Sequence, residues 1–335
     1  MEKLIEKFNR KIDDSAPLTI NPEHSRRIDY LRISVTDRCN LRCVYCMPSS
    51  GIETVTQNEL LTFEEIIRLV KILVGLGIRR IRLTGGEPLV RKGIVALIER
   101  ISDIKGVEDI SLTTNGILLA SYARLLRKAG LKGINISLDT LNPEKFRIIT
   151  GSDSLSGVLE GIKIARQEGF LLKLNMVVMR GENDDEIINF VKFTLDNNLI
   201  LRFIEFMNVT PLWKEDYFIP IEEVKDICEK EFGLRKADYK SFGPAQYYQI
   251  KDGMIGFIKT SIDNCKGCSR LRLTSTGELK LCLYQSGGVS LRDLLRKGEN
   301  DNYIMDILRD LFCLKDDVDY RRWQRPQIYM CSVGG

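Results

Sequence analysis

The chain has 335 residues, of which 44% are hydrophobic, so it can bury a sizeable core. Its net charge of +4 is small and its 50 basic residues are spread along the chain, which disfavours nucleic acid as a partner. Its nine cysteines, grouped at metal-ligand spacing, disfavour a secreted disulfide scaffold, and the sequence shows neither a signal-peptide pattern nor an apolar run of about 18 residues. We therefore expect a cytoplasmic protein that binds neither nucleic acid nor membranes.

A single histidine, His24, lies in a polar N-terminal segment. Histidine is the usual acid–base side chain near neutral pH, so its scarcity disfavours a catalytic triad or a zinc hydrolase. If the protein is an enzyme, we expect a cofactor to carry the difficult step, and we assign no catalytic side chain.

Residues 1–28 are polar and mixed in charge, and we interpret them as a lead-in segment. From residue 30 onward, short β-branched segments alternate with amphipathic helical segments. Thr62 and Glu65 have the spacing of a capping box at the start of the first helix. Strands are predicted at 30–36, 80–84, 110–114, 133–138, 171–178 and 199–205, with helices between them near 63–74, 92–102, 118–129, 155–168 and 184–197.

Six alternating units predict an α/β fold with a parallel sheet and right-handed crossovers. Six are too few to close an eight-stranded barrel, so a partial, open (β/α)6 TIM-like barrel and a doubly wound sheet both fit. We expect residues 29–210 to form this domain. The alternation then fades, and residues 211–335 are assigned to a C-terminal region with a helix at 221–231, a strand at 253–260, a hairpin turning at Thr276-Gly277 and helical sequence at 290–325.

Three cysteines, Cys39, Cys43 and Cys46, follow the first predicted strand at the spacing C-x3-C-x2-C. Thiolates so close together converge on one metal centre and favour zinc, copper(I) or an iron–sulfur cluster. Zinc usually takes four ligands, whereas three thiolates on a cubane leave one iron open to a substrate or cofactor. Three buried structural cysteines, or part of a zinc knuckle, are the alternative.

Small and polar residues gather at the ends of the predicted strands. Gly85-Gly86-Glu87-Pro88 follows the second strand, Thr113 lies near the end of the third, and Ser137 and Asp139 close the fourth. Ligand sites in parallel α/β folds form at this edge of the sheet. We expect the glycines to allow close approach of a ligand and Glu87 to pair with an ammonium group, although Gly-Gly alone also fits a tight turn.

A second set of cysteines, Cys265, Cys268 and Cys282, lies in the C-terminal region. The spacing alone fits a structural zinc ribbon, completed by Cys228, Cys313 or Cys331, as well as it fits a second cluster. Arg270 and Arg272 alternate with leucines on a predicted strand, so both point to one face beside the cysteines. Paired guanidinium groups there favour a phosphate-bearing ligand, although a solvated strand face is the alternative.

Together, these motifs resemble the radical S-adenosylmethionine (SAM) superfamily and, within it, the family that cyclises GTP in the first step of molybdenum-cofactor biosynthesis. The resemblance runs from about residue 30 to the C-terminus. It is carried by the stretches Leu31–Asn40, Ile81–Pro88, Leu112–Gly116, Asn135–Asp139, Leu201–Met207 and Cys265–Arg272 and by the terminal Gly334-Gly335.

The resemblance implies a partial (β/α)6 barrel with a C-terminal segment that carries a second 4Fe–4S cluster across the barrel mouth. It further implies that a 5′-deoxyadenosyl radical, derived from SAM at the first cluster, removes hydrogen from C3′ of GTP. Bond formation to C8 then gives (8S)-3′,8-cyclo-7,8-dihydroguanosine 5′-triphosphate. The implied partners are GTP, an unidentified one-electron donor, the next pathway enzyme and a second copy of the chain in a homodimer.

Residue by residue, the resemblance assigns Cys39, Cys43 and Cys46 to the first cluster and Cys265, Cys268 and Cys282 to the second. It implies SAM contacts for Tyr45, Gly86, Glu87, Ser137 and Met207, and GTP contacts for Arg32, Arg82, Thr113, Lys173, Arg270, Leu271 and Arg272. A peptide-modifying radical SAM enzyme with an auxiliary cluster is the nearest alternative, and a zinc-bearing nucleic-acid binder is the alternative from another class.

Overall fold

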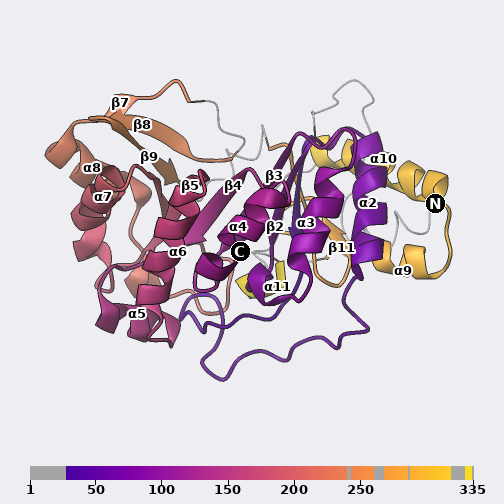
Figure 1. The fold of residues 1–335 in the computed structure, drawn as a ribbon, viewed down its shortest axis with the longest axis horizontal. Coiled ribbons are helices and arrows are strands. Elements are labelled where there is room, and N and C mark those ends of the chain that lie inside the picture. The colour runs from indigo at the N-terminus through magenta and orange to yellow at the C-terminus, as the bar shows by residue number, and fades with distance from the viewer. Residues whose placement is uncertain (1–27, 240–242, 260–267, 286, 318–328, 334–335) are drawn as a thin grey trace.

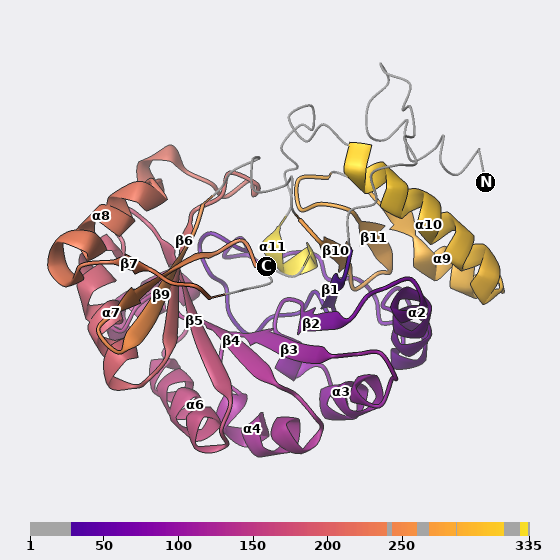
Figure 2. The same ribbon diagram turned by 90° about the horizontal axis from the view of Figure 1, so that it is seen from above.

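The computed structural model describes residues 28–239, 243–259, 268–285, 287–317 and 329–333. Its strands form one sheet in the order β12-β11-β10-β1-β2-β3-β4-β5-β6-β9-β8-β7, which curves into an open barrel (Figures 1 and 2). The six strands predicted from the sequence are β1 (Tyr30–Ser34), β2 (Arg80–Thr84), β3 (Asp109–Thr114), β4 (Gly133–Ser137), β5 (Leu171–Val178) and β6 (Ile200–Glu205). They lie side by side in chain order and parallel, without the reversal of a doubly wound sheet, so the partial barrel is confirmed.

Helices cover the outer face of the sheet (Figure 2). The predicted crossover helices are α2 (Phe63–Gly75), α3 (Ile94–Ser102), α4 (Leu119–Lys128), α6 (Leu155–Gln167) and α7 (Ile187–Asp196), with short 3₁₀ turns η1 (Pro88–Val90), η2 (Asp184–Glu186) and η3 (Glu215–Tyr217). The capping box of α2 is confirmed, because Glu65 N donates to the Thr62 hydroxyl and Thr62 N donates to the Glu65 carboxylate. The sequence analysis did not predict α5 (Pro143–Thr150), which Asn142 caps from its side-chain oxygen.

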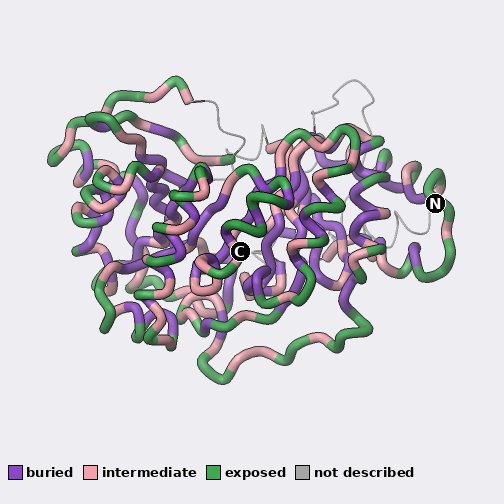
Figure 3. The backbone as a smooth tube through the Cα atoms, in the orientation of Figure 1, coloured by how far each residue is buried: buried purple, intermediate pink, exposed green. Residues whose placement is uncertain are grey.

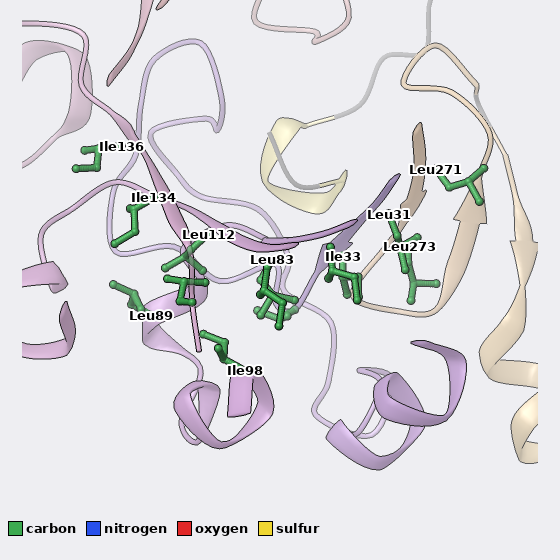
Figure 4. Close-up of a cluster of buried hydrophobic side chains, with 14 of the residues drawn as sticks. Leu31, Ile33, Leu83, Leu89, Ile98, Leu112, Ile134, Ile136, Leu271 and Leu273 are labelled. Atoms are coloured by element: carbon green, nitrogen blue, oxygen red, sulfur yellow. The ribbon is translucent and has the colours of Figure 1, made fainter. Parts of the chain in front are cut away.

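The hydrophobic core lies between the sheet and these helices. On β1, Leu31 and Ile33 are fully buried against the helices, whereas Arg32, between them, faces the other side of the sheet. The same alternation continues across the neighbouring strands, and Figure 4 shows the row of apolar side chains from Leu271 to Ile136. Figure 3 shows buried residues along the strands and exposed ones on the outer helices. The inner face of the barrel is therefore free to carry polar groups.

The C-terminal region extends the sheet at both edges. β9 (Gly253–Ile258) pairs parallel with β6, and β8 (Gln246–Ile250) and β7 (Arg235–Lys236) follow it antiparallel at the outer edge of the sheet. β10 (Arg270–Leu273) pairs parallel with β1 and continues into β11 (Glu278–Lys280) and β12 (Val289–Ser290). The predicted hairpin is confirmed, with Gly277 in its turn at φ +84°.

The remaining helices are α8 (Ile221–Phe232), α9 (Leu291–Arg296), α10 (Asp301–Asp317) and α11 (Met330–Val333). In Figure 2, α11 lies on the inner side of the open barrel, near β1 and β10. None of the described helices has the length and apolarity needed to cross a membrane. Residues 1–27, Cys265 and the terminal Gly-Gly lie outside the described residues.

Candidate functional site

The loop that carries the first three cysteines follows β1 and is held against the glycines that follow β2. Gly86 N donates to Thr36 O at 2.8 Å, and Glu87 N donates to Arg38 O at 2.8 Å. A Cβ on Gly86 would lie 2.3 Å from Arg38 O, so only glycine permits this approach. The Gly-Gly pair therefore fixes the backbone directly before Cys39.

The other side of the cysteine loop is held by α5. Arg42 N donates to Thr150 O and Val44 N donates to Ile149 O, each at 2.9 Å. The loop thus bonds to carbonyl groups in the last turn of α5, which have no partner within the helix. Cys46 N closes a turn onto Cys43 O at 2.9 Å. Cys39, Cys43 and Cys46 are thus carried by a backbone that is held on both flanks.

Tyr45 is oriented by a buried carboxylate. Its hydroxyl donates to Asp139 Oδ2 at 2.6 Å, and the other oxygen of Asp139 accepts from Val177 N at 2.8 Å. Burial raises the pKa of Asp139 to about 6. The ring of Tyr45 also meets Phe206 edge-on, with ring centroids 6.3 Å apart.

Glu87 is fully buried beside the loop. Its oxygens accept from Leu89 N at 2.9 Å, from the Thr114 hydroxyl at 2.8 Å and from Asn115 N at 2.7 Å. Burial raises the pKa of this carboxyl to about 7. In the structure, Glu87 joins the ends of β2 and β3, and its contact with a SAM amino group stays a prediction.

Arginines from three parallel strands meet on the inner face of the barrel. Arg32 is directly paired with Arg272 of β10 on one side and with Arg82 of β2 on the other. Burial, and then the charges of the neighbouring arginines, lower the pKa of Arg32, and burial with the charge of Arg270 lowers that of Arg272 to about 10. Like charges held this close, away from water, form a site for a polyanion.

The second set of thiols lies beside these arginines. Arg270 Nε donates to Cys268 Sγ at 3.2 Å. Burial raises the pKa of the Cys268 thiol, but the charges of Arg270 and Lys315, together with hydrogen bonds from Arg270, hold the pKa below its ordinary value. The Cys268 thiol thus lies in an electropositive environment, which favours the thiolate form that binds metals.

Cysteines of both sets, all three of the first and Cys268 and Cys282 of the second, line one cavity of about 330 Å³ on the inner face of the barrel. Fourteen of the residues predicted from the sequence line it, namely Cys39, Cys43, Cys46, Cys268 and Cys282; Tyr45, Gly86, Ser137 and Met207; and Arg32, Arg82, Thr113, Arg270 and Arg272. The loop, the strand ends and the C-terminal hairpin therefore form one site.

Three predicted residues lie outside that lining. Glu87 is buried behind it, and Leu271 is buried in the core with its side chain toward the helices. Lys173 lies next to the cavity, where burial, and then the charges of Arg202 and Arg82, lower its pKa to about 8. Its Nζ donates to Tyr239 Oη at 3.1 Å.

Arg202 and Cys331 line the cavity but were not among the predicted site residues. Arg202 on β6 is buried and donates to Asn135 Oδ1, and its position as a lone charge between Leu201 and Phe203 was the available signal. Cys331 on α11 lines the cavity beside Cys46 of the first loop. Cys331 was considered only as a fourth zinc ligand of the second set, and the structure instead brings it to the first.

The donor set of the first loop fits an iron–sulfur cluster. A cubane takes thiolate ligands and spreads them over separate irons. Three cavity-lining thiols on a backbone shaped by glycine fit that group, and Cys268 and Cys282 across the cavity offer a further pair of thiols.

Two family profiles match the chain: the Radical SAM superfamily over residues 33–194 and Molybdenum Cofactor Synthesis C over residues 199–320. A GTP 3′,8-cyclase from Peptoclostridium acidaminophilum is 50% identical over 284 residues, which cover 83% of this chain and 87% of the relative. A GTP 3′,8-cyclase from Thermodesulfovibrio yellowstonii is 44% identical over 320 residues, which cover 93% and 98%.

Among solved structures, Streptococcus suis SuiB bound to S-adenosylmethionine aligns with a TM-score of 0.61 at 17% identity, over 91% of this chain and 71% of SuiB. The structure of anSMEcpe with bound AdoMet and a Kp18Cys peptide aligns with a TM-score of 0.54 at 16% identity, over 88% and 87%. At these identities the likeness establishes the fold alone. The two full-length relatives decide the family, and the chain belongs to the GTP 3′,8-cyclases of the radical SAM superfamily.

Proposed function

We propose that this protein cyclises GTP to (8S)-3′,8-cyclo-7,8-dihydroguanosine 5′-triphosphate, the first step of molybdenum-cofactor biosynthesis. One observation carries the proposal: the three-cysteine loop and a cluster of partly buried arginines line the same cavity. Among the described residues, the cations that line it are Arg32, Arg82, Arg202, Lys259, Arg270 and Arg272, against the carboxylates of Asp139 and Glu205. A triphosphate carries about four negative charges, which such a surplus of cations offsets.

Membership of the radical SAM superfamily implies a 4Fe–4S cluster and SAM as cofactors. Together these groups supply a 5′-deoxyadenosyl radical when they are bound. We propose that Cys39, Cys43 and Cys46 hold this cluster, because the three thiols line one cavity on a backbone that is fixed on both sides.

We further propose that Cys265, Cys268 and Cys282 hold a second 4Fe–4S cluster. The short contact between Arg270 and Cys268 supports a thiolate at that position. Leu281 and Cys282 line the cavity next to the arginine row, so a group bound there would meet the substrate.

The remaining roles follow the position of each side chain. We propose that Tyr45, Gly86, Ser137 and Met207 contact SAM. We also propose that Glu87, held between the ends of β2 and β3, pairs with the amino group of SAM. We propose that the arginines orient the triphosphate and that Thr113 and Lys173 contact GTP, with Leu271 contributing through its backbone. We assign no catalytic acid or base to the chain, because the bound cofactors would supply the chemistry of hydrogen abstraction.

The protein's partners and boundaries are also proposals. We propose a one-electron donor, transfer of the product to the next pathway enzyme, a homodimer, and a cytoplasmic location without nucleic-acid or membrane partners. We keep the division into a lead-in segment (1–28), a radical SAM barrel (29–210) and a C-terminal auxiliary-cluster region (211–335).

The proposal is tested by anaerobic reconstitution, followed by addition of dithionite, SAM and GTP. About eight irons per chain and GTP-dependent formation of 5′-deoxyadenosine and the cyclic product are expected. Bound zinc, or turnover with a peptide and none with GTP, would favour the alternatives of a nucleic-acid binder or a peptide-modifying enzyme.

Two substitutions separate the two halves of the site. Cys43→Ala is expected to abolish 5′-deoxyadenosine formation. Arg270→Ala is expected to weaken GTP use while SAM cleavage uncoupled from GTP continues, and Arg309→Ala, a matched change of an exposed arginine on α10, is expected to alter neither. Loss of both activities in Arg270→Ala would contradict its assignment to the substrate.

A further inference from the structure

Lys315 is a buried cation that the proposed roles do not use. It lies in the last turn of α10 and is fully buried. Its Nζ donates to the carbonyl oxygen of Arg270 at 2.7 Å and to that of Leu281. These carbonyls belong to opposite arms of the β10–β11 hairpin, so one ammonium group ties the two arms together at the open end of the hairpin.

The open end of the hairpin is where the second set of thiols is anchored. Cys268 precedes Arg270 by two residues, and Cys282 directly follows Leu281. Both thiols line the cavity. The position of Lys315 therefore fixes the separation of two of the three cysteines assigned to the second cluster.

The charge of Lys315 also acts on this site. Burying an ammonium group is costly unless dipoles or negative charges surround it. Two carbonyl groups and the C-terminal end of α10 supply dipoles of the right sign. The charge also lies close to the proposed ligands, because Leu281, whose carbonyl group accepts from Lys315 Nζ, directly precedes Cys282.

We propose that Lys315 is a positioning residue of the second iron–sulfur site. It holds the two arms that carry Cys268 and Cys282, and its charge favours the reduced, more negative form of the cluster. The inference rests on the proposed second cluster and goes beyond it, because it assigns control of the reduction potential to a residue that lies outside the cavity lining.

The test uses the full-length chain with Cys39, Cys43 and Cys46 replaced by alanine, so that only the second site can hold iron. Lys315 is then changed to Met, which removes the charge and both hydrogen bonds, to Gln, which keeps an amide donor, and to Arg, which keeps the charge. Lys297→Met, on the exposed end of α9, is the matched control. The readouts are iron content and the midpoint potential from a redox titration followed by electron paramagnetic resonance.

With Lys315 present, about four irons per chain are expected. In Lys315→Gln the ratio of reduced to oxidised cluster at a fixed potential should fall about tenfold, which is a shift of about −59 mV for a one-electron couple. Lys315→Arg should restore the wild-type potential. Lys315→Met should lose iron more readily than Lys315→Gln, because it keeps no hydrogen-bond donor.

Each failure has a separate meaning. Absence of iron while Lys315 is intact would overturn the second cluster itself. Four irons with the same potential in all variants would leave the cluster standing and overturn the role of the Lys315 charge. Loss of iron in every Lys315 variant, Arg included, would show that only the packing of this side chain matters and would also overturn the proposal.

Discussion

Substitution of Gly86 by alanine tests how the first cysteine loop is shaped. The Cβ would lie 2.3 Å from Arg38 O and 2.8 Å from Asp37 O, whereas ordinary contact begins at 3.4 Å. The backbone before Cys39 must therefore move by roughly 1 Å. Both neighbours are backbone atoms, so no side-chain rotation can relieve the overlap.

The magnitude follows from the bonds at this contact. Moving the loop breaks or lengthens the hydrogen bonds from Gly86 N to Thr36 O and from Glu87 N to Arg38 O. Each contributes about 0.5–1.5 kcal/mol net, so Gly86→Ala should lower the free energy of unfolding by about 1–3 kcal/mol. A metal ligand must be held to within about 0.5 Å, so a shift of this size should also reduce iron content by about half or more.

Gly157→Ala is the matched control, because its Cβ would meet Ile117 O at an ordinary 3.7 Å and the residue lies inside α6. This change should stabilise the chain by about 0.4–1 kcal/mol. Urea unfolding of the metal-free chains and iron counts after anaerobic reconstitution measure both effects. Wild-type stability and wild-type iron content in Gly86→Ala, or equal losses in Gly157→Ala, would refute the reasoning.

Three further predictions concern buried polar groups of the site. The pKa of Glu87 is raised from an ordinary 4.5 to about 7, so the folded chain binds more protons than the unfolded chain between these values, and stability should fall by about 3 kcal/mol as the pH rises across them. Urea unfolding at pH 5 and 7.5 should show this slope in the wild type, and Glu87→Gln should keep only the smaller fall that comes from the raised pKa of Asp139. Tyr45→Phe removes a 2.6 Å hydrogen bond to Asp139 and should lower the free energy of unfolding by about 1–3 kcal/mol in the same assay at pH 7. An unchanged free energy of unfolding would mean that protonation of the Asp139 carboxyl replaces this bond. Arg202→Met should weaken GTP binding by about tenfold or more in calorimetry and leave SAM binding unchanged, whereas equal weakening of both would place the arginine elsewhere in the mechanism.

Most of the barrel was predictable from the sequence because its strands and helices carry strong local signals. The alternation of Arg32 and Arg82 with apolar neighbours predicts both the strands and their two faces. What local signals cannot give is the pairing between distant segments. Nothing within residues 270–280 indicates that β10 pairs parallel with β1. That pairing depends on the unpaired edge that the six-stranded sheet leaves at β1.

The site was predictable to a similar extent and for similar reasons. Cysteine spacing and glycines at strand ends are local, and they identified both thiol sets and the Gly-Gly contact. α5 was missed because its eight residues begin at Pro143 and carry only a short apolar stripe, yet its carbonyl groups hold the cysteine loop. Cys331 was misjudged because its neighbour is determined by the path of the chain end, which no spacing rule contains.

The arrangement of the sheet also explains how one cavity combines two chemistries. β1 carries Arg32 within the strand and leads directly into the first cysteine loop, while β10 carries Arg272 at the same register and follows directly on Cys268. Parallel pairing of these two strands therefore aligns the arginines and brings Cys268 and Cys282 to the same cavity as the first cysteine loop. Because β9 and β10 cover the two edges of the six-stranded barrel, the C-terminal region completes the sheet as well as the site. The boundary near residue 211 divides the sequence into two patterns, but the strands of both parts are hydrogen-bonded in one continuous sheet.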